Sequence, residues 1–263
     1  MERIVLILGS GPAAVAVQDW DRSVFSHVVA INNAWRLRPD WNVSIHPEDF
    51  PVGHRPTLLG PGQSRVDAQD YVPVQNRYGG FVYAGGTMAF TAGYWALGAL
   101  KPRVMAFFGC DMVYPTSGAT HFYGTGSADP LRADITLQSL EAKAARLQLL
   151  AAAQGCACVN LSGDESRLVF PRAALTGVVK AAPVTPDPFR VAVAKAREAA
   201  LGYTVPSGRY WEELDRFDAG ALRDLDALWL RAHSASVRTG LTPGTADPFH
   251  LRGAAASGFR RGA

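Results

Sequence analysis

The segment Gly9-Ser10-Gly11-Pro12 directly follows the first apolar run of the chain. Glycines at such a turn let the backbone approach a phosphate group closely, and a helix that begins there offers its N-terminal N–H groups to the anion. The segment lacks the third glycine of a dinucleotide-binding fingerprint and the lysine of a P-loop. It predicts a nucleotide-binding turn, and a purely structural strand-to-helix turn is the alternative.

A second group of candidates lies on or beside a long loop rich in glycine, serine and threonine, residues 112–134. Asp111 precedes this loop and follows an apolar run, a place where an acidic residue can hold a ribose or a metal ion. Tyr114, His121 and Tyr123 lie within the loop, whose length is typical of a lid or of a disordered segment. Imidazole and hydroxyl donors on a closing lid can neutralise a diphosphate or protonate a leaving group. We therefore predict catalytic roles for His121, Asp111 and Tyr123, and a ligand contact for Tyr114.

Asparagine and histidine side chains follow the next two apolar runs. Asn32 and Asn33 carry amides that both donate and accept hydrogen bonds, which suits ribose hydroxyls or the edge of a base, although asparagine also caps helices and forms turns. His46 stands beside Glu48 and Asp49, so it could belong to a metal or acid–base cluster or to the start of a solvated loop. We predict that Asn32, Asn33 and His46 contact the ligand.

Gly86 and Thr87 begin the most regular helical pattern of the chain. A threonine N-cap with small residues before it leaves N–H groups at the positive end of the helix dipole, which can bind a second phosphate. The alternative is that the glycine lets the helix pack closely. We include both residues in the predicted binding site.

These candidates depend on elements that place them along one edge of a sheet. Apolar runs predict strands at residues 4–8, 27–31, 43–45, 103–108 and 156–161, and such continuous runs are typical of strands buried on both faces of a parallel sheet. Helical patterns alternate with them at residues 13–20, 87–100 and 135–153. The alternation predicts an α/β protein with a Rossmann-like, doubly wound and mainly parallel sheet. Ligands bind outside the carboxyl ends of such strands, where the candidates and the segment Ser162-Gly163-Asp164 lie.

Length and composition set the scale of this fold. The chain has 263 residues, of which 48% are hydrophobic, and a formal net charge of +3. These values exclude wholesale disorder and give no reason to expect a nucleic-acid partner. We predict a nucleotide-binding domain at residues 1–170, a small helical C-terminal appendage at 171–238 and a mobile tail at 239–263.

Further patterns bear on location and assembly. No apolar run reaches the roughly 18 residues needed to span a bilayer, and no signal peptide is evident. The three cysteines are too few for a disulfide framework. We therefore expect a cytoplasmic protein without a transmembrane segment. The stretch from Trp211 to Trp229 offers apolar surface for a homo-oligomer.

Several of these motifs together resemble a known superfamily. Gly9-Ser10-Gly11-Pro12 resembles the G-x-G-P-S opening of the family 42 glycosyltransferases, which are bacterial sialyltransferases that use CMP-sialic acid, and of proteins similar to archaeal 6-hydroxymethylpterin diphosphokinase. The other matching positions are Asn32, His46-Pro47 in place of Asn-Pro, Gly86-Thr87, Gly109-Cys110-Asp111 and Tyr114. Residues 30–36 and 120–124 also resemble uncharacterised phage and prophage proteins of this superfamily.

The resemblance covers about residues 3–170 and implies a transferase that depends on a nucleotide or nucleotide-sugar donor, with a CMP-linked sugar as one such donor. Two departures count against sialyl transfer. Ser10 stands where the sialyltransferases have asparagine. No histidine lies between His121 and His233 to match their catalytic one, so that base is absent or replaced by His121. The alternatives are an ATP- and Mg²⁺-dependent diphosphokinase-like enzyme, with Glu48, Asp49 and Asp111 as metal ligands, or a non-catalytic phage or prophage protein that retains the fold.

Overall fold

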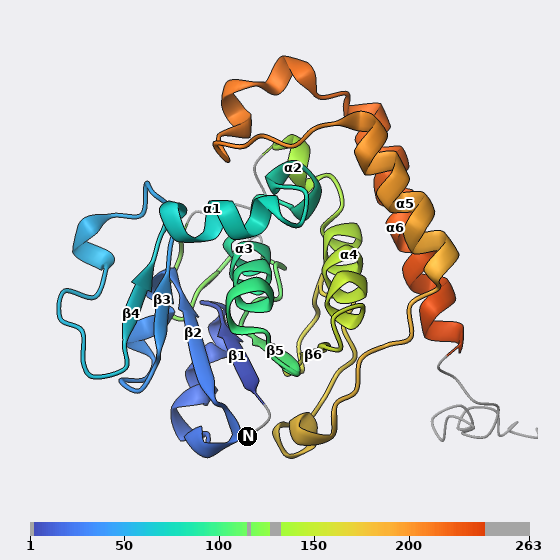
Figure 1. Cartoon of the computed structure of the whole chain (residues 1–263). Coiled ribbons are helices and arrows are strands. Elements are labelled where there is room, and N and C mark those ends of the chain that lie inside the picture. Colours follow the sequence, from blue (N-terminus) through green and yellow to red (C-terminus); the bar gives the residue numbers. More distant parts are fainter. Residues whose placement is uncertain (1–2, 115–116, 127–132, 240–263) are drawn as a thin grey trace, which may run out of the picture.

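Six parallel strands form a single sheet in the order β4-β3-β2-β1-β5-β6 (Figure 1). They are β1 (Ile4–Leu8), β2 (His27–Ile31), β3 (Val43–Ile45), β4 (Ser64–Val66), β5 (Val104–Phe108) and β6 (Ala157–Asn160). Because β2 to β4 lie on one side of β1, and β5 and β6 on the other, the sheet is doubly wound with its switch point between β1 and β5. The computed structural model, which describes residues 3–114, 117–126 and 133–239, thereby confirms the predicted α/β class.

Helices cover both faces of the sheet, with a different kind of helix on each. One face, with Val5 and Ile7, packs against α1, α3 and α4. These helices are α1 (Ala68–Asn76), α3 (Met88–Trp95, continued by the π-helical turn Ala96–Leu100) and α4 (Leu140–Ala152). The opposite face, with Leu6 and Leu8, packs against the 3-10 segments Pro12–Asp19, Asn32–Arg36 and Leu175–Lys180. Since β1 is buried on both faces, its side chains are all apolar.

The observed helices lie at the predicted positions, but parts of them are 3-10 or π-helical. The helix predicted at 87–100 is confirmed as α3 with its π-helical turn, and Thr87 is its N-cap. Residues 12–19 form a 3-10 helix, in which i to i+3 hydrogen bonds tighten the turn. The helix predicted at 135–153 is divided, because Asp134 caps the 3-10 turn Ile135–Leu137 and Ser139 separately caps α4.

No pattern used above predicts β4, α1 or the short helix α2 (Phe81–Ala84). In β4 only Val66 is buried, so the strand has no apolar run. Helix α1 contains Pro73, which removes a backbone donor and obscures the helical pattern. Asp67 and Asp70 form a capping box at the start of α1, and this spacing is the signal that identifies the helix in the sequence.

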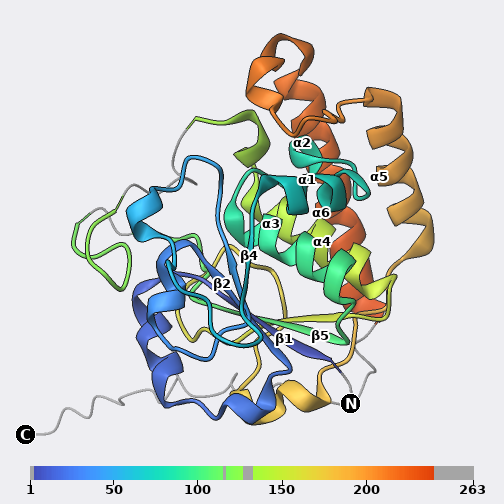
Figure 2. The ribbon, with the colours of Figure 1, turned by 60° about the vertical axis from the view of Figure 1, so that its left-hand side comes forward.

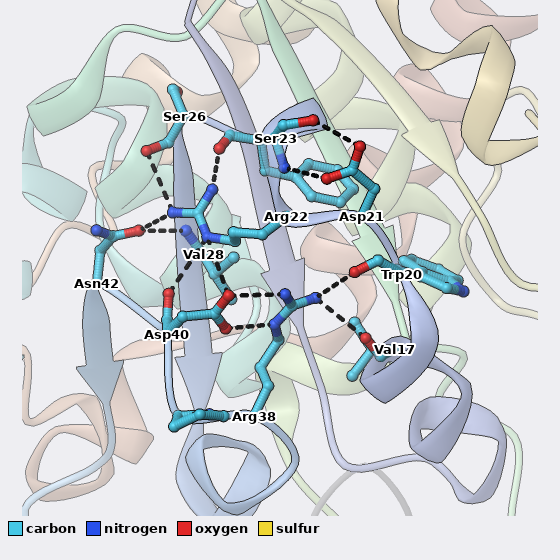
Figure 3. Close-up of polar contacts among 12 residues, drawn as sticks. Val17, Trp20, Asp21, Arg22, Ser23, Ser26, Val28, Arg38, Asp40 and Asn42 are labelled. Atoms are coloured by element: carbon cyan, nitrogen blue, oxygen red, sulfur yellow. Dashed lines mark hydrogen bonds and ion pairs between the residues drawn. The ribbon is translucent and has the colours of Figure 1, made fainter.

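A polar network fixes the amino ends of β2 and β3, at the edge opposite the carboxyl ends of the strands (Figure 3). Asn42 Oδ1 accepts hydrogen bonds from Val28 N at 2.9 Å and from Arg22 Nη2 at 2.6 Å. Arg38 donates two hydrogen bonds to the Asp40 carboxylate, at 2.6 and 2.8 Å, and one to a carbonyl of the first 3-10 helix. These bonds join the loops before both strands and help to hold their register.

The C-terminal helices lie beside α4 (Figure 2), and buried ion pairs join them to it. Helix α6 (Ala219–Thr239) packs against α4, and α5 (Pro188–Leu201) packs against α6. Lys143 Nζ lies 2.8 Å from Asp226 Oδ1. Arg146 donates two hydrogen bonds to the Glu198 carboxylate, at 2.7 and 2.8 Å. Both cations are buried, so each depends on its partner to offset the loss of hydration.

The two tryptophans that bound the predicted apolar surface of the C-terminal third differ in exposure. Trp211 is 55% exposed, whereas Trp229 is 1% exposed, so only the first of these two tryptophans offers surface to a partner. From residue 240 onward the predicted tail lies outside the described residues. Within the described ranges, no helix has both the length and the apolarity to cross a bilayer. The domain boundary at residue 170 and the homo-oligomer remain predictions.

We expect Arg146→Met to lower the free energy of unfolding by about 3–5 kcal/mol, because it leaves the Glu198 carboxylate buried without a cation. The matched control is Arg167→Met. Arg167 pairs with Glu141 at a site where both side chains are more than a third exposed, and we expect its loss to cost about 1 kcal/mol or less. Urea denaturation of both variants measures the difference. Equal losses would contradict a structural role for the buried pair.

Candidate functional site

A cleft of about 270 Å³ opens at the switch point between β1 and β5. Its walls come from the loops that follow β1, β2, β5 and β6, from the start of α3 and from residues 112–114, 120, 121 and 123. Parallel strands end at the same edge of the sheet, so residues far apart in the sequence meet there. The cleft therefore lies where the topology predicts a ligand site.

Most of the predicted site residues line this cleft. They are Gly9, Ser10, Gly11, Pro12, Asn32, Thr87, Asp111, Tyr114, His121 and Tyr123. Asn33, His46 and Gly86 are not among the lining residues. The fold thus brings ten of the predicted residues together, and their binding and catalytic roles remain predictions.

Two turns at the base of the cleft pack backbone against backbone. Gly9 N donates to the Phe108 carbonyl at 2.8 Å, and Gly11 N donates to the Gly109 carbonyl at 2.9 Å. A Cβ atom at residue 9 would lie 2.2 Å from the Gly109 carbonyl oxygen, which explains the glycine. Because both amides are already bonded, a phosphate contact here would have to come from other groups. Burial raises the pKa of the neighbouring Cys110 thiol above its usual range, which disfavours the reactive thiolate form.

Two lining residues have a left-handed backbone, Asn32 with φ 51° and Met112 with φ 55°. Asparagine adopts this conformation more readily than most residues, whereas methionine rarely does, and strained backbone of this kind concentrates at functional sites. The Asn32 Oδ1 atom is buried without a hydrogen-bond partner. An unsatisfied buried acceptor costs about 1–3 kcal/mol. A ligand donor that reached this amide after a side-chain rotation would recover part of that energy.

The loop over the glycine turn is anchored to it by the backbone. Phe122 N donates to the Ser10 carbonyl at 3.0 Å. His121 and Gly124 exchange two backbone hydrogen bonds, each of 3.0 Å, which closes a tight turn. Phe122 also packs against the core on the 3-10 face of the sheet. This part of the predicted lid is therefore docked rather than open.

Aromatic side chains of the same loop form a stack along the cleft. The His121 ring lies 4.9 Å from the Tyr123 ring at an interplanar angle of 20°, and 6.0 Å from the Tyr114 ring. Thr120 Oγ1 lies 2.8 Å from His121 Nδ1 and holds the imidazole in place. Tyr123 is exposed, so its ring has a free face. The stack offers an imidazole and two phenols to a ligand.

Acidic side chains from two loops also line the cleft, namely Asp111, Asp164 and Glu165. Asp111 Oδ1 accepts a hydrogen bond from Asn160 Nδ2 at 3.3 Å. Asp164 follows β6 as Asp111 follows β5, and this placement is the signal that identifies it in the sequence. Glu165 has no such signal and was missed. None of the described residues that line the cleft is a lysine or an arginine.

The described part of the chain contains no group of three or more histidine, cysteine, aspartate or glutamate side chains that could hold a metal ion. Glu48 and Asp49 do not line the cleft, and Glu48 lies 3.6 Å from the guanidinium of Arg209. The structure therefore does not bring these two carboxylates together with Asp111. A divalent cation in the cleft would need oxygen ligands from its substrate as well as from the protein.

Asn33 and His46 are buried outside the cleft lining. His46 stacks on Phe50 with ring centroids 5.6 Å apart, and its Nδ1 atom lies 3.0 Å from the Pro47 carbonyl. Burial lowers the pKa of His46 below its ordinary value, because the imidazolium would lose hydration, and the hydrogen bond to Pro47 only partly opposes this. The nearby Arg55 lowers this pKa further. His46 is thus a neutral packing residue at neutral pH.

Gly86 lies outside the cleft lining, next to the lining residue Thr87. Its N–H donates to Thr136 Oγ1 at 2.9 Å, so this amide is not available to a phosphate. A Cβ atom at residue 86 would lie 2.7 Å from the Tyr210 hydroxyl oxygen and 2.9 Å from Thr136 Oγ1. Close packing, the alternative that the sequence left open, therefore accounts for this glycine.

Comparison with known proteins identifies no relative. No family model, no curated protein and no solved structure matches the chain. The resemblance to the sialyltransferase and diphosphokinase superfamily remains a prediction from short motifs.

We expect Gly9→Ala to lower the free energy of unfolding by about 3 kcal/mol, because the new methyl group meets a backbone carbonyl that cannot move without shifting β5. Gly163→Ala is the matched control, since a Cβ atom at residue 163 has nothing within 4 Å. Urea denaturation measures both. A Gly9→Ala protein as stable as the control would refute the close backbone contact.

A buried histidine with a lowered pKa makes stability depend on pH. Above the ordinary pKa of 6.5 folded and unfolded chains both hold neutral His46. As the pH falls below this value, the unfolded chain takes up a proton that the folded chain resists, so stability falls toward the lowered folded pKa. We expect His46→Phe, which keeps a ring against Phe50, to lose less stability than the wild type between about pH 7.5 and about pH 5.5.

Thermal denaturation at the two pH values tests this expectation. His27 and His233, whose pKa values burial also lowers, remain in the variant, so part of the pH dependence persists. An identical loss of stability in the variant and the wild type would show that His46 does not contribute.

Proposed function

We propose that this protein is a transferase that binds a nucleotide or nucleotide-sugar donor, for example a CMP-linked sugar, in the cleft between β1 and β5. One observation carries the proposal. The residues that follow β1, β2, β5 and β6 all line one cleft at the switch point of a doubly wound sheet, which is the general ligand site of such sheets.

Different lining residues have different roles in the proposed reaction. The Asn32 amide and the Asp111 carboxylate suit the hydroxyl groups of a ribose or a sugar. Tyr123 has an exposed ring against which a planar base can stack. His121, held by Thr120, is the general acid or base, with Tyr114 and Tyr123 as hydroxyl donors to the leaving phosphate. A positioned acid or base of this kind contributes about 100- to 10,000-fold in rate.

A second candidate is diphosphoryl transfer from ATP with Mg²⁺, and the charge of the cleft favours it. The cleft has the carboxylates of Asp111, Asp164 and Glu165, and no lysine or arginine among its described lining residues. Phosphates need a counter-charge, and Mg²⁺ is usually held by one or two carboxylates together with substrate phosphates. Asp111 and Asp164 would hold such an ion, which would neutralise charge on the transferred group.

Calorimetric titration with CMP, CDP, UDP and ATP, each with and without Mg²⁺, tests the proposal. We expect at least one nucleotide to bind with a dissociation constant of about a millimolar or less. Asn32→Gly keeps a residue that accepts the left-handed backbone and removes the amide. We expect it to weaken binding about tenfold, the loss of roughly one hydrogen bond. No binding by any nucleotide, with an unchanged melting temperature, would instead support a non-catalytic protein that retains the fold.

The magnesium dependence separates the two candidates. If Mg²⁺ bridges the phosphates to Asp111, then Asp111→Asn should weaken Mg²⁺-dependent binding about tenfold or more, because a charged ligand of the ion is lost. If the donor binds without metal, the same variant should change affinity little, since asparagine still offers an oxygen acceptor. Asp49→Asn, the same chemical change outside the cleft lining, is the matched control and should have no effect in either case.

A further inference from the structure

A chain of hydrogen bonds connects the C-terminal segment, by which we mean residues 188–239 from the start of α5 to the end of α6, with the start of α3. The Tyr210 hydroxyl donates to Asp134 Oδ2 at 2.6 Å. Asp134 Oδ1 accepts from the Thr136 hydroxyl at 2.7 Å and from Thr136 N at 2.8 Å. Thr136 Oγ1 in turn accepts from Gly86 N at 2.9 Å. We call the series Tyr210, Asp134, Thr136 and Gly86 the relay.

The relay ends directly behind the wall of the cleft. Gly86 precedes Thr87, which caps α3 and lines the cleft together with Met88 and Ala89. The Thr87 hydroxyl also contacts Met112 Sδ at 3.7 Å, so Thr87 bridges the helix to the left-handed turn after Asp111. A shift of Gly86 would therefore move this wall of the cleft and the turn beside it.

The contact between Tyr210 and Gly86 allows little freedom. A single carbon atom added at residue 86 would lie 2.7 Å from the Tyr210 hydroxyl oxygen and 2.9 Å from Thr136 Oγ1. Interiors packed this closely transmit a displacement instead of absorbing it. The Asp134 carboxylate strengthens both hydrogen bonds that it accepts from hydroxyl groups, because bonds to an ionised acceptor are about twice as strong as neutral ones.

Tyr210, which belongs to the C-terminal segment, packs against α6 and α2. It is buried, its ring lies 6.3 Å from the ring of Phe81, and it belongs to the same apolar cluster as Leu222, Leu225 and Trp229 of α6. The buried ion pairs of Lys143 and Arg146 fix α6 and α5 against α4. The position of Tyr210 therefore depends on whether this segment is packed against α4.

We propose that Tyr210 is a positioning residue for the cleft, and that docking of the C-terminal segment and occupancy of the cleft stabilise each other through the relay. The second half of this statement rests on the proposed binding function. Coupling between two such sites is reciprocal. When the segment is undocked, Asp134 loses the hydrogen bond from the Tyr210 hydroxyl, so Thr136 and Gly86 are held less firmly and the cleft is less ordered. A ligand that orders the cleft in turn favours the docked segment.

Tyr210→Phe tests the relay, because it removes the hydroxyl and keeps the ring. Without any ligand, we expect faster hydrogen exchange at the amides of Gly86, Phe90 and Thr91, whose N–H groups are bonded to Thr136 or Thr87. For the nucleotide that binds the wild type best, we expect affinity to fall about fivefold. Tyr203→Phe is the matched control. Tyr203 lies in the same segment, and its hydroxyl accepts a bond from Asp218 N outside the relay, so both readouts should stay at the wild-type level.

The two readouts keep the two proposals apart. If no nucleotide binds the wild type, the proposed function fails, and the exchange rates still decide whether the relay exists. If nucleotides bind and Tyr210→Phe changes neither exchange nor affinity, or changes them no more than Tyr203→Phe does, the positioning role is refuted. A uniform rise in exchange across the sheet would also refute it, because that result reports general destabilisation.

A double-mutant cycle gives a second, independent test. Gly86→Ala places a methyl group against the Tyr210 hydroxyl, and we expect a lower melting temperature and weaker nucleotide binding. In the Gly86→Ala background, Tyr210→Phe removes the closest contact, so it should cost less than in the wild type or restore part of the loss. Purely additive effects would show that the two residues are not coupled.

Discussion

The cleft depends on one close backbone contact, between the turns that follow β1 and β5. The Gly109 carbonyl oxygen lies where the side chain of residue 9 would begin, and it accepts a hydrogen bond from Gly11 N. In a doubly wound sheet the chain leaves in opposite directions on either side of this point, so the contact determines how near the two halves approach. It places Ser10 on one side of the cleft and Asp111 on the other. The predicted lid is attached to the same place, through the bond from Phe122 N to the Ser10 carbonyl.

The charge of the cleft limits how it can bind a phosphate. Sites that recognise phosphate through side chains usually use arginine or lysine, and the described lining residues include neither. The amides of Gly9 and Gly11 are bonded to the neighbouring turn, which removes another common source of phosphate contacts. Under the proposed function, a nucleotide phosphate in this cleft would lie against the start of α3, whose residues Thr87, Met88 and Ala89 line the cleft, or would bring a divalent cation to the carboxylates. Magnesium dependence is for this reason the property that separates the two candidate functions.

The C-terminal helices share polar contacts with the core that apolar packing alone would not supply. Buried ion pairs add little net stability, because the charges lose hydration, but breaking one is costly. The pairs made by Lys143 and Arg146 therefore specify where α5 and α6 lie more than they strengthen the fold. The same segment supplies Tyr210, whose hydroxyl group stands at the head of the relay to Gly86. The sequence predicts this segment as an appendage, but in the structure its Tyr210 contacts the residues that hold Gly86 beside the cleft.

The sequence alone determined the class of the fold, most of the strands and the place of the cleft. Continuous apolar runs such as Ile4–Leu8 require burial on both faces, and the turn residues after them had to meet at one edge. It could not determine β4, which has one buried side chain, or the contribution of Glu165, which no pattern marks. It also left open whether the glycines bind phosphate or pack. Only the tertiary structure shows why a side chain is excluded at residues 9 and 86, because the atoms that exclude it, from Gly109 and Tyr210, belong to segments about a hundred residues or more away in the chain. Patterns within a short stretch of sequence contain no information about such long-range contacts, and these contacts determine the shape of the cleft.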